Sequence, residues 1–102
     1  MSVYGLGLIT IEEREVYERY ARRFIEVLRP FGGRLLAADE APQVIEGNSS
    51  IGKVVLVEFG DERSFTDWFS SADYQEIAKD RRAGSTGAIL LVRALPQPGE
   101  DA

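Results

Sequence analysis

The stretch "KVVLVEFGDERSFTDWFSSADYQEIAKDRR", Lys53 to Arg82, decides the fold. Its first seven residues, Lys53 to Phe59, are rich in β-branched side chains and predict a strand. Asp61 is the expected N-cap of a helix, because its carboxylate can accept a hydrogen bond from a free backbone N–H of the first turn. Three aromatic residues then share one face of that helix: Phe65, Trp68 and Phe69. The stretch therefore begins as a strand followed by a helix with an aromatic face.

The rest of the stretch and the residues after it predict a further helix and a last strand. Ser70 or Ser71 breaks the first helix, and a short helix is expected from about Ala72 to Arg81. Residues 83–87, "AGSTG", are expected to form a loop. The apolar run from Ala88 to Leu95 predicts a strand.

The N-terminal third predicts a strand and an amphipathic helix. Val3 to Ile9 is an apolar run typical of a strand. Thr10 is the expected N-cap of the helix, and Thr10 with Glu13 fits the capping-box pattern. The helix is expected to end near Arg29, since Pro30 cannot continue it. Its apolar face consists of Tyr17, Tyr20, Phe24 and Leu28.

The middle of the chain predicts one more strand. Arg34 to Glu40 has strand character, and Pro42 interrupts it. Gln43 to Gly47 fits either a short extension or an edge strand, and residues 48–52 form a polar turn. The resulting order, β-α-β-β-α-β with the second helix split, is typical of an α+β ferredoxin-like fold with a four-stranded antiparallel sheet and helices on one face. We expect a single domain over residues 1–95 and a flexible C-terminal tail over 96–102.

Both faces of this sheet are apolar, which predicts an assembly. Val55 and Val57 alternate with Val54 and Leu56, and the last strand alternates in the same way. A sheet covered by helices on one side is normally polar on the other. An uncovered apolar face favours a homodimer in which two sheets pack face to face across a two-fold axis.

Composition limits the functions that are open to the chain. The formal net charge is -5 and the sequence pI about 4.7, so nucleic acid is not expected as a partner. There is no cysteine and no histidine, which removes thiolate chemistry and the commonest base and metal ligand. We expect no metal and no intrinsic cofactor. The lack of cysteine fits a reducing, cytoplasmic location. From the residues at the N-terminus we expect neither a signal peptide nor a membrane span.

The sequence resembles a known family. Four parts of the chain are together similar to the family called domain of unknown function thirteen-thirty: "FGGRLL" after the first helix, "VIEG" before the third strand, "VVLVEFGDERSFTDWFSSADYQEIAKDRR" (54–82) and the closing apolar strand. The resemblance covers about Tyr4 to Leu95, and its most specific part is the spacing of Trp68, Ser71, Tyr74 and Arg81. Ala72 stands where the family often has proline, and Arg81 is doubled by Arg82.

The resemblance implies a dimeric α/β barrel, in which ferredoxin-like protomers pack their sheets together. It implies little about function, because relatives in that superfamily include cofactor-free monooxygenases, isomerases, dehydratases, decarboxylases and haem proteins. A choice among these would rest on fold analogy alone.

Four candidate residues lie in the most specific part of the resemblance. Trp68 fits core packing with its indole N–H satisfied nearby, or one wall of a pocket. Tyr74 could pack its ring and still direct its hydroxyl into a cavity. Ser71 fits a helix cap better than a nucleophile, since no base is evident. Arg81 or Arg82 is either a surface charge or an inward cation that pairs with Glu46 or holds a substrate carboxylate.

Further candidates lie on the strands and in the middle loop. Glu46 and Asp39 are candidate carboxylates for acid–base chemistry together with Tyr74, and Tyr4 is a candidate pocket wall. Gly5 and Gly7 share one strand face, where they permit either a close helix or a cavity. Three functions remain open: an enzyme acting on a small aromatic or carboxylate-bearing molecule, a non-catalytic ligand-binding module, and a structural homodimer.

Overall fold

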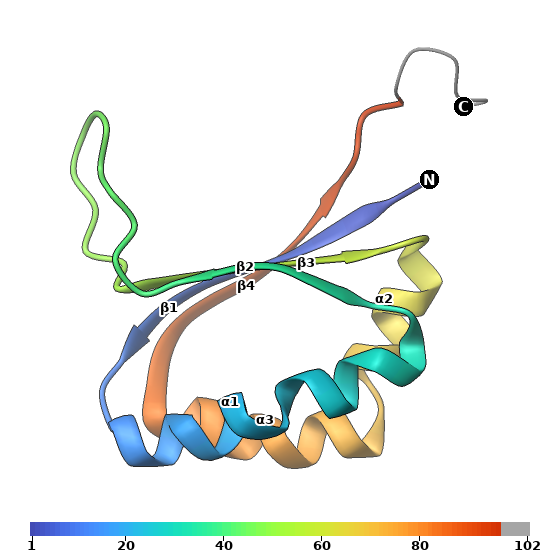
Figure 1. Ribbon diagram of the computed structural model, residues 1–102, viewed down its shortest axis with the longest axis horizontal. Coiled ribbons are helices and arrows are strands. Elements are labelled where there is room, and N and C mark those ends of the chain that lie inside the picture. Colours follow the sequence, from blue (N-terminus) through green and yellow to red (C-terminus); the bar gives the residue numbers. More distant parts are fainter. Residues whose placement is uncertain (97–102) are drawn as a thin grey trace.

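The chain forms four strands and three helices in the computed structural model, which describes residues 1–96 (Figure 1). A single 3-10 turn, η1 (Arg29–Phe31), extends the first helix. The elements are β1 (Val3–Ile11), α1 (Arg14–Leu28), β2 (Arg34–Asp39), β3 (Lys53–Phe59), α2 (Glu62–Phe69), α3 (Ala72–Gly84) and β4 (Ser85–Arg93). The predicted order of elements is confirmed. Most of the predicted tail, residues 97–102, lies outside the described residues.

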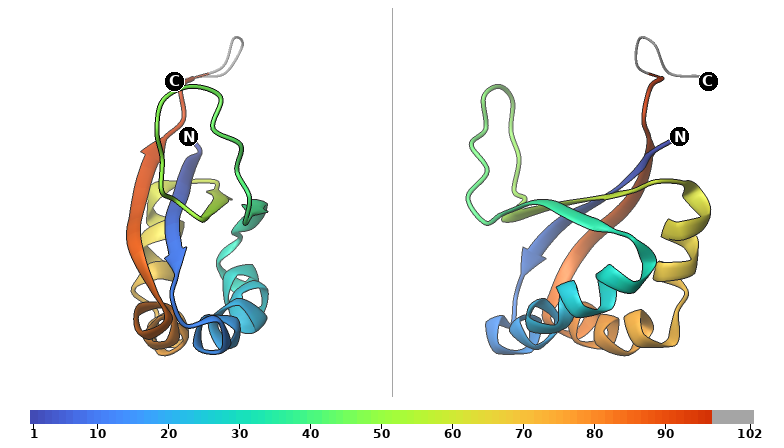
Figure 2. Two further views of the ribbon diagram at one scale, coloured as in Figure 1. Left: turned by 90° about the vertical axis from the view of Figure 1, so that its left-hand side faces the viewer. Right: turned by 45° about the vertical axis from the view of Figure 1, so that its right-hand side comes forward.

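The strands form one antiparallel sheet in the order β2-β3-β1-β4. All three helices cover the same face of the sheet (Figures 1 and 2). Helices α1 and α3 lie side by side, and α2 stands across one end of the sheet (Figure 1). This is the ferredoxin-like α+β architecture that the sequence predicts.

The core lies between the helices and the sheet and is largely aromatic. The predicted apolar face of α1 is confirmed, because Tyr17, Tyr20, Phe24 and Leu28 are all buried. From the sheet, Val57 and Phe59 pack against it. The two predicted caps in the second half are also confirmed: the carboxylate of Asp61 accepts from Ser64 N at 2.7 Å, and the hydroxyl of Ser71 accepts from Tyr74 N at 3.1 Å.

The predicted cap and capping box at Thr10 are wrong. Thr10 lies within β1, where it pairs with Thr86 of β4, so it continues the sheet instead of starting a helix. The backbone N–H groups of Glu12 and Glu13 instead donate to the carbonyl oxygen of Gly84, at 2.9 and 3.0 Å. The amides that precede α1 are therefore satisfied by a residue far along the chain. Glu13, the N-cap of α1, makes no side-chain hydrogen bond to the helix.

The predicted loop at residues 83–87 is also wrong. Helix α3 continues to Gly84, and β4 begins at once with Ser85, because residues 85–87 pair with the far end of β1. The last strand also ends earlier than predicted, at Arg93 instead of Leu95. Helix and strand are thus joined without a connecting loop, at the point where Gly84 packs against the start of α1.

The segment between β2 and β3 contains no strand. The proposed strand at residues 43–47 is wrong: β2 ends at Asp39, and residues 40–52 form a long loop that projects beyond the sheet on the side away from the helices (Figures 1 and 2). Its few internal hydrogen bonds are local, such as that from Ile51 N to Ser49 Oγ. A bulge between Leu35 and Ala37 also shifts the register of β2 against β3.

The face of the sheet away from the helices is apolar, as the sequence predicts. Leu6 of β1 pairs with Leu56 on one side and Leu90 on the other, which forms a row of leucines across three strands. Leu90 and Val92 each expose 42% of their surface. No segment among residues 1–96 covers this face (Figure 1).

The junction at Gly84 yields the first prediction. A Cβ at this position would lie 2.7 Å from Tyr17 N and 3.0 Å from Glu13 O, and both are backbone atoms. We expect Gly84→Ala to lower the free energy of unfolding by about 1–3 kcal/mol, as overpacking does elsewhere. Urea unfolding measures it. Gly60→Ala is the control, because its Cβ meets nothing within 4 Å; equal effects of the two variants would contradict this view of the junction.

Candidate functional site

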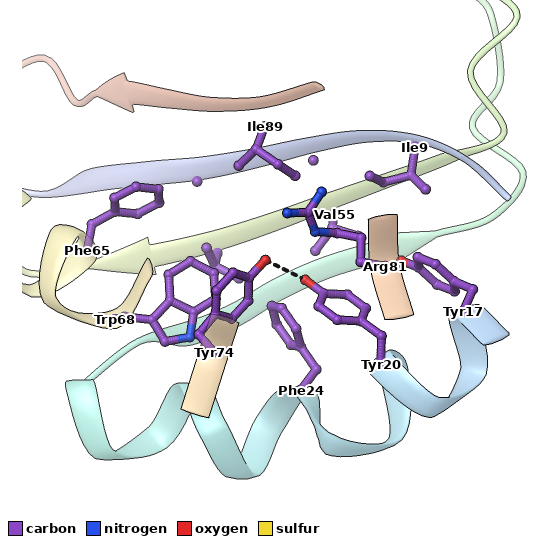
Figure 3. Close-up of a pocket in the computed structure, with 13 residues that line it drawn as sticks. Ile9, Tyr17, Tyr20, Phe24, Val55, Phe65, Trp68, Tyr74, Arg81 and Ile89 are labelled. Atoms are coloured by element: carbon purple, nitrogen blue, oxygen red, sulfur yellow. Dashed lines mark hydrogen bonds between the residues drawn. The ribbon is translucent and has the colours of Figure 1, made fainter. Parts of the chain in front are cut away.

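A cavity of about 30 Å³ lies between the helix layer and the sheet. Glycines of β1 form its roof, and aromatic side chains of α1, α2 and α3 form its walls (Figure 3). Arg81 extends into it from α3. The residues that determine its chemistry are Gly7, Tyr20, Trp68, Tyr74, Arg81 and Ile89.

The two glycines of β1 have different roles: one permits the close approach of a helix and the other leaves a cavity, which are the two alternatives that the sequence allows. A Cβ on Gly5 would lie 2.8 Å from the ring of Phe65, so this glycine permits the close approach of α2. A Cβ on Gly7 would make only ordinary contacts, at 3.5 Å with Val55 and 3.7 Å with Ile89. The missing side chain of Gly7 therefore leaves open space, and that space belongs to the cavity.

Two tyrosine hydroxyls meet in the wall of this cavity. Tyr20 of α1 and Tyr74 of α3 are buried, and their hydroxyl oxygens are 2.9 Å apart (Figure 3). One hydroxyl donates to the other, so the pair keeps one further O–H that needs an acceptor. Burial raises the pKa of Tyr20 well above its usual range and that of Tyr17 to about 12. These two phenols stay protonated at neutral pH and act as hydrogen-bond donors.

Arg81 brings a cation to the same cavity, and no ion pair involves it in the part of the chain that the structure describes. Its Nε is buried and has no hydrogen-bond partner among the described residues. Its guanidinium carbon lies 6.0 Å from the ring centroid of Tyr20. Arg82, in contrast, is exposed and donates to Gln75 Oε1 at 2.8 Å. Arg81 is therefore the inward arginine of the pair.

The polar groups of the cavity are thus almost all donors. The spare phenolic O–H and the guanidinium N–H groups face a space whose other walls are aliphatic and aromatic. A buried donor without an acceptor is unfavourable by about 1–3 kcal/mol, and more when it is charged. The complementary group is an anionic acceptor such as a carboxylate, which Arg recognises in a planar, bidentate manner.

Trp68 is a packing residue that also borders the cavity. It is buried against Phe24, Phe59, Phe65 and Tyr74, with ring centroids 4.2 to 5.9 Å apart. Trp68 therefore packs in the core, which is one of the two interpretations that the sequence allows. Its indole N–H, however, has no partner among the described residues, although the sequence led us to expect one.

The structure does not bring the other sequence candidates to this cavity. Ser71 caps α3 and donates to the carbonyl oxygen of Trp68 at 2.7 Å. Tyr4 lies on β1 opposite Glu58 and Val92, on the face of the sheet away from the helices. Its ring is therefore separated from the cavity by the sheet itself.

The two candidate carboxylates lie outside the cavity. Glu46 is exposed in the projecting loop, and among residues 1–96 no ion pair joins it to Arg81. Asp39 is exposed at the end of β2, where its carboxylate accepts from Ala41 N at 2.8 Å. Asp39 pairs with Val54, and the bulge before Ala37 places it on the face of the sheet away from the helices, opposite to that of Leu35. Neither group is placed to move a proton on a molecule in this cavity.

Two residues of the site were not among the sequence candidates. The sequence places Tyr20 in the core only. Its residue type could have indicated a polar role as well, because a buried tyrosine hydroxyl needs a hydrogen-bond partner. Lys53 begins β3, is only 8% exposed and lines a second chamber beside the cavity. A lysine in phase with Val55 and Val57, the residues that face the helices, could have marked it.

Other kinds of site are not evident in residues 1–96. No group of three or more acidic side chains there is arranged to hold a metal ion. None of the helices in this part of the chain has the length and apolar character needed to cross a bilayer.

Comparisons with known proteins agree on the fold. A family model described as "Domain of unknown function (DUF1330)" matches residues 2–95. A protein of unknown function from Rhodopseudomonas palustris, RPA0582, superposes with a TM-score of 0.79 at 17% identity, over 94% of this chain and 84% of the other. No match was found among curated proteins.

Two further structures extend the comparison. SnoaB from Streptomyces nogalater, described as a cofactor-independent oxygenase, has a TM-score of 0.65 at 16% identity and covers 97% of this chain and 98% of its own. A "dabb family protein with a ferredoxin-like fold" from Mesorhizobium loti has a TM-score of 0.63 at 15% identity, over 94% and 97%. At these identities the likeness establishes a shared fold.

The unpaired charge of Arg81 yields the second prediction. Arg81 is partly buried and its Nε is fully buried without a partner, so an apolar side chain of similar length removes part of a desolvation penalty. We expect Arg81→Met to raise the free energy of unfolding of the ligand-free protein by about 1 kcal/mol. Urea unfolding in an anion-poor buffer measures it. A loss of more than about 1 kcal/mol would mean that Arg81 already has a stabilising partner in the free protein.

Proposed function

This chain belongs to the family described as "Domain of unknown function (DUF1330)", a description that assigns no activity, and we propose from the cavity alone that it binds a small anionic molecule between the helices and the sheet. The ligand has an acidic head, a carboxylate or an enolate, and a compact aromatic or apolar body. Arg81 anchors the head, Tyr20 and Tyr74 donate to it, and Trp68 packs beside the body.

One observation carries this proposal. The Nε of Arg81 is buried, faces the cavity and has no partner within residues 1–96. A protein gains no stability from such a group, so its presence is best explained by a ligand that completes it. The remaining wall residues are apolar, which suits a ligand whose charge is confined to one end.

The size of the cavity limits the ligand. The space around Arg81 is about 30 Å³, and a neighbouring chamber that shares its walls adds about 130 Å³. An apolar cavity of about 150 Å³ holds a benzene ring. The combined space thus matches a single ring, and a monocyclic carboxylic acid would need the shared side chains to move and part of the acid to extend toward the open side of the pockets. The ligand is smaller than a typical drug-sized molecule.

The same groups favour binding or stabilisation of an anion over proton abstraction by the protein. Tyr20 and Tyr17 are held in their protonated forms, and the candidate carboxylates Glu46 and Asp39 lie elsewhere. A non-catalytic binding module is thus the function that the geometry supports best.

Conversion of the ligand is a second candidate. Fixed donors in a largely apolar space are the arrangement that stabilises a developing oxyanion. SnoaB, which shares the fold, is described as a cofactor-independent oxygenase. In an enzyme of this kind, Arg81 and the tyrosine pair would hold the ionised form of the substrate.

We also propose that the protein is a homodimer through the open face of the sheet. The row of Leu56, Leu6 and Leu90 would pack against the same row of a second copy, since a two-fold axis brings identical surfaces together. The projecting loop would lie at the margin of that interface, with Ile45 84% exposed in the single chain. A purely structural homodimer, the third function considered, would need this face but not the donors of the cavity.

The binding proposal is tested with benzoate as the probe. We expect Arg81→Met to weaken benzoate binding about ten-fold or more, because charge-assisted hydrogen bonds contribute about 1.5–3 kcal/mol. Arg82→Met is the matched control, since Arg82 lies one residue away and faces solvent. Gly7→Ala should keep the fold and weaken binding by filling the cavity. Chemical-shift titration by NMR gives the affinities; equal effects of the two arginine variants would refute the site.

The dimer proposal is tested by sedimentation equilibrium. The wild-type chain is expected to have twice its 11.3 kDa mass at micromolar concentration. Leu90→Lys should yield folded monomers, because it places a charge in the centre of the interface. Ala83→Lys adds the same charge at an exposed position of α3, away from the open face, and should stay dimeric. A monomeric wild-type protein would end this proposal.

A further inference from the structure

A second cation borders the chamber next to the cavity. This chamber, of about 130 Å³, is formed by α1, β2 and the start of β3. Lys53 lines it and is more than nine-tenths buried. The chamber and the cavity of Arg81 share the side chains of Tyr17, Tyr20, Phe24 and Val55 as walls. The two spaces are thus compartments of one interior, separated by side chains only.

The ammonium group of Lys53 makes only long contacts with the described residues. Its Nζ lies 3.8 Å from Glu40 Oε2, which is an ion-pair distance longer than a hydrogen bond. It also lies 4.8 Å from the ring centroid of Tyr17, a cation–π contact. An ammonium has three N–H donors. A buried lysine with these contacts alone can still accept a stronger anionic partner.

Glu40 is itself shared between two cations. Arg14 Nη2 binds Glu40 Oε1 at 2.9 Å, and this hydrogen bond is the main reason that the pKa of Glu40 is lowered. Its bond to Arg14 is the short one and its contact with Lys53 the long one. Glu40 is also the first residue of the projecting loop and is about half exposed. Its carboxylate can leave Lys53 while it stays bound to Arg14.

Two aromatic rings lie between the two cations. Lys53 is over Tyr17, Arg81 is over Tyr20, and the centroids of these two rings are 5.5 Å apart. Figure 3 shows Tyr17, Tyr20 and Arg81 around the same space. The interior therefore offers a positive charge at each end and an aromatic wall between them.

We propose that the ligand has two acidic groups, one held by Arg81 and one by Lys53, with a compact apolar body against Tyr17 and Tyr20. The class is that of small dicarboxylic acids or aromatic acids with a second acidic group. This inference rests on the proposed function at Arg81 and adds Lys53 as the residue that determines specificity. Glu40 occupies the Lys53 position in the free protein and is displaced when the second acidic group arrives.

The experiment compares one-headed and two-headed probes. Benzoate is the one-headed probe, and isophthalate and terephthalate carry a second carboxylate at two different spacings. Affinities are measured by NMR titration at constant ionic strength for the wild type, Lys53→Met, Arg81→Met and Glu40→Gln. Unfolding midpoints of each variant confirm that it is folded. Lys79→Met is the control, because Lys79 is exposed and pairs with Glu76 on the surface.

The expected result is a gain that depends on Lys53. At least one of the two diacids should bind about ten-fold more tightly than benzoate, as a second charge-assisted contact provides. Lys53→Met should abolish this gain and leave benzoate binding within about two-fold, whereas Arg81→Met should weaken all three probes. Glu40→Gln should strengthen diacid binding, because it removes the competitor for Lys53.

Two outcomes separate the two proposals. If benzoate binding depends on Arg81 but neither diacid binds more tightly, or Lys53→Met changes nothing, then the two-headed ligand is wrong and the anion site at Arg81 stands. If no probe binds in an Arg81-dependent manner, the proposed function and this inference fail together.

Discussion

The packing of aromatic rings around Trp68 is the interaction on which the rest of the structure depends. Its indole ring contacts Phe24 of α1, Phe59 of β3, Phe65 of α2 and Tyr74 of α3. One side chain thus joins all three helices to the sheet, and edge-to-face contacts of this kind add to the burial of apolar area. The cluster holds the helix layer at the end of the sheet where α2 crosses it (Figure 1).

The other end of the helix layer is held by backbone contacts, and the cavity follows from both. Gly84 carries α3 directly into β4 and accepts hydrogen bonds from the residues that enter α1. Between these two points, Gly7 supplies no side chain to fill the space. Arg81 and the tyrosine pair face that space with donors that lack an acceptor. A site of this kind is maintained at some expense of stability, which is common where a protein binds a ligand.

The sequence predicted the elements well, and the site less well. Periodicity located β3, the apolar face of α1 and the caps Asp61 and Ser71, because these features depend on neighbours in the sequence. Thr10 failed because the strand pairing of β1 with β4 outweighed its local preference for a helix start. Arg81 and Arg82 have the same residue type, and only the packing of α3 decides which one turns inward. Lys53 and Tyr20 lie on apolar faces, so their polar ends show a function only once the space beside them is known.

The most direct test of the account is the ¹H–¹⁵N NMR signal of the Arg81 Nε–H group, identified by its loss in the Arg81→Met protein. The account predicts that this signal in the free protein lacks the shift of a hydrogen-bonded guanidinium. Saturation with an acidic ligand should shift it strongly and slow its exchange with water, while the Arg82 signal stays in place. An Arg81 signal that already shows a hydrogen bond in the free protein, or that does not respond to any bound acid, would contradict the account.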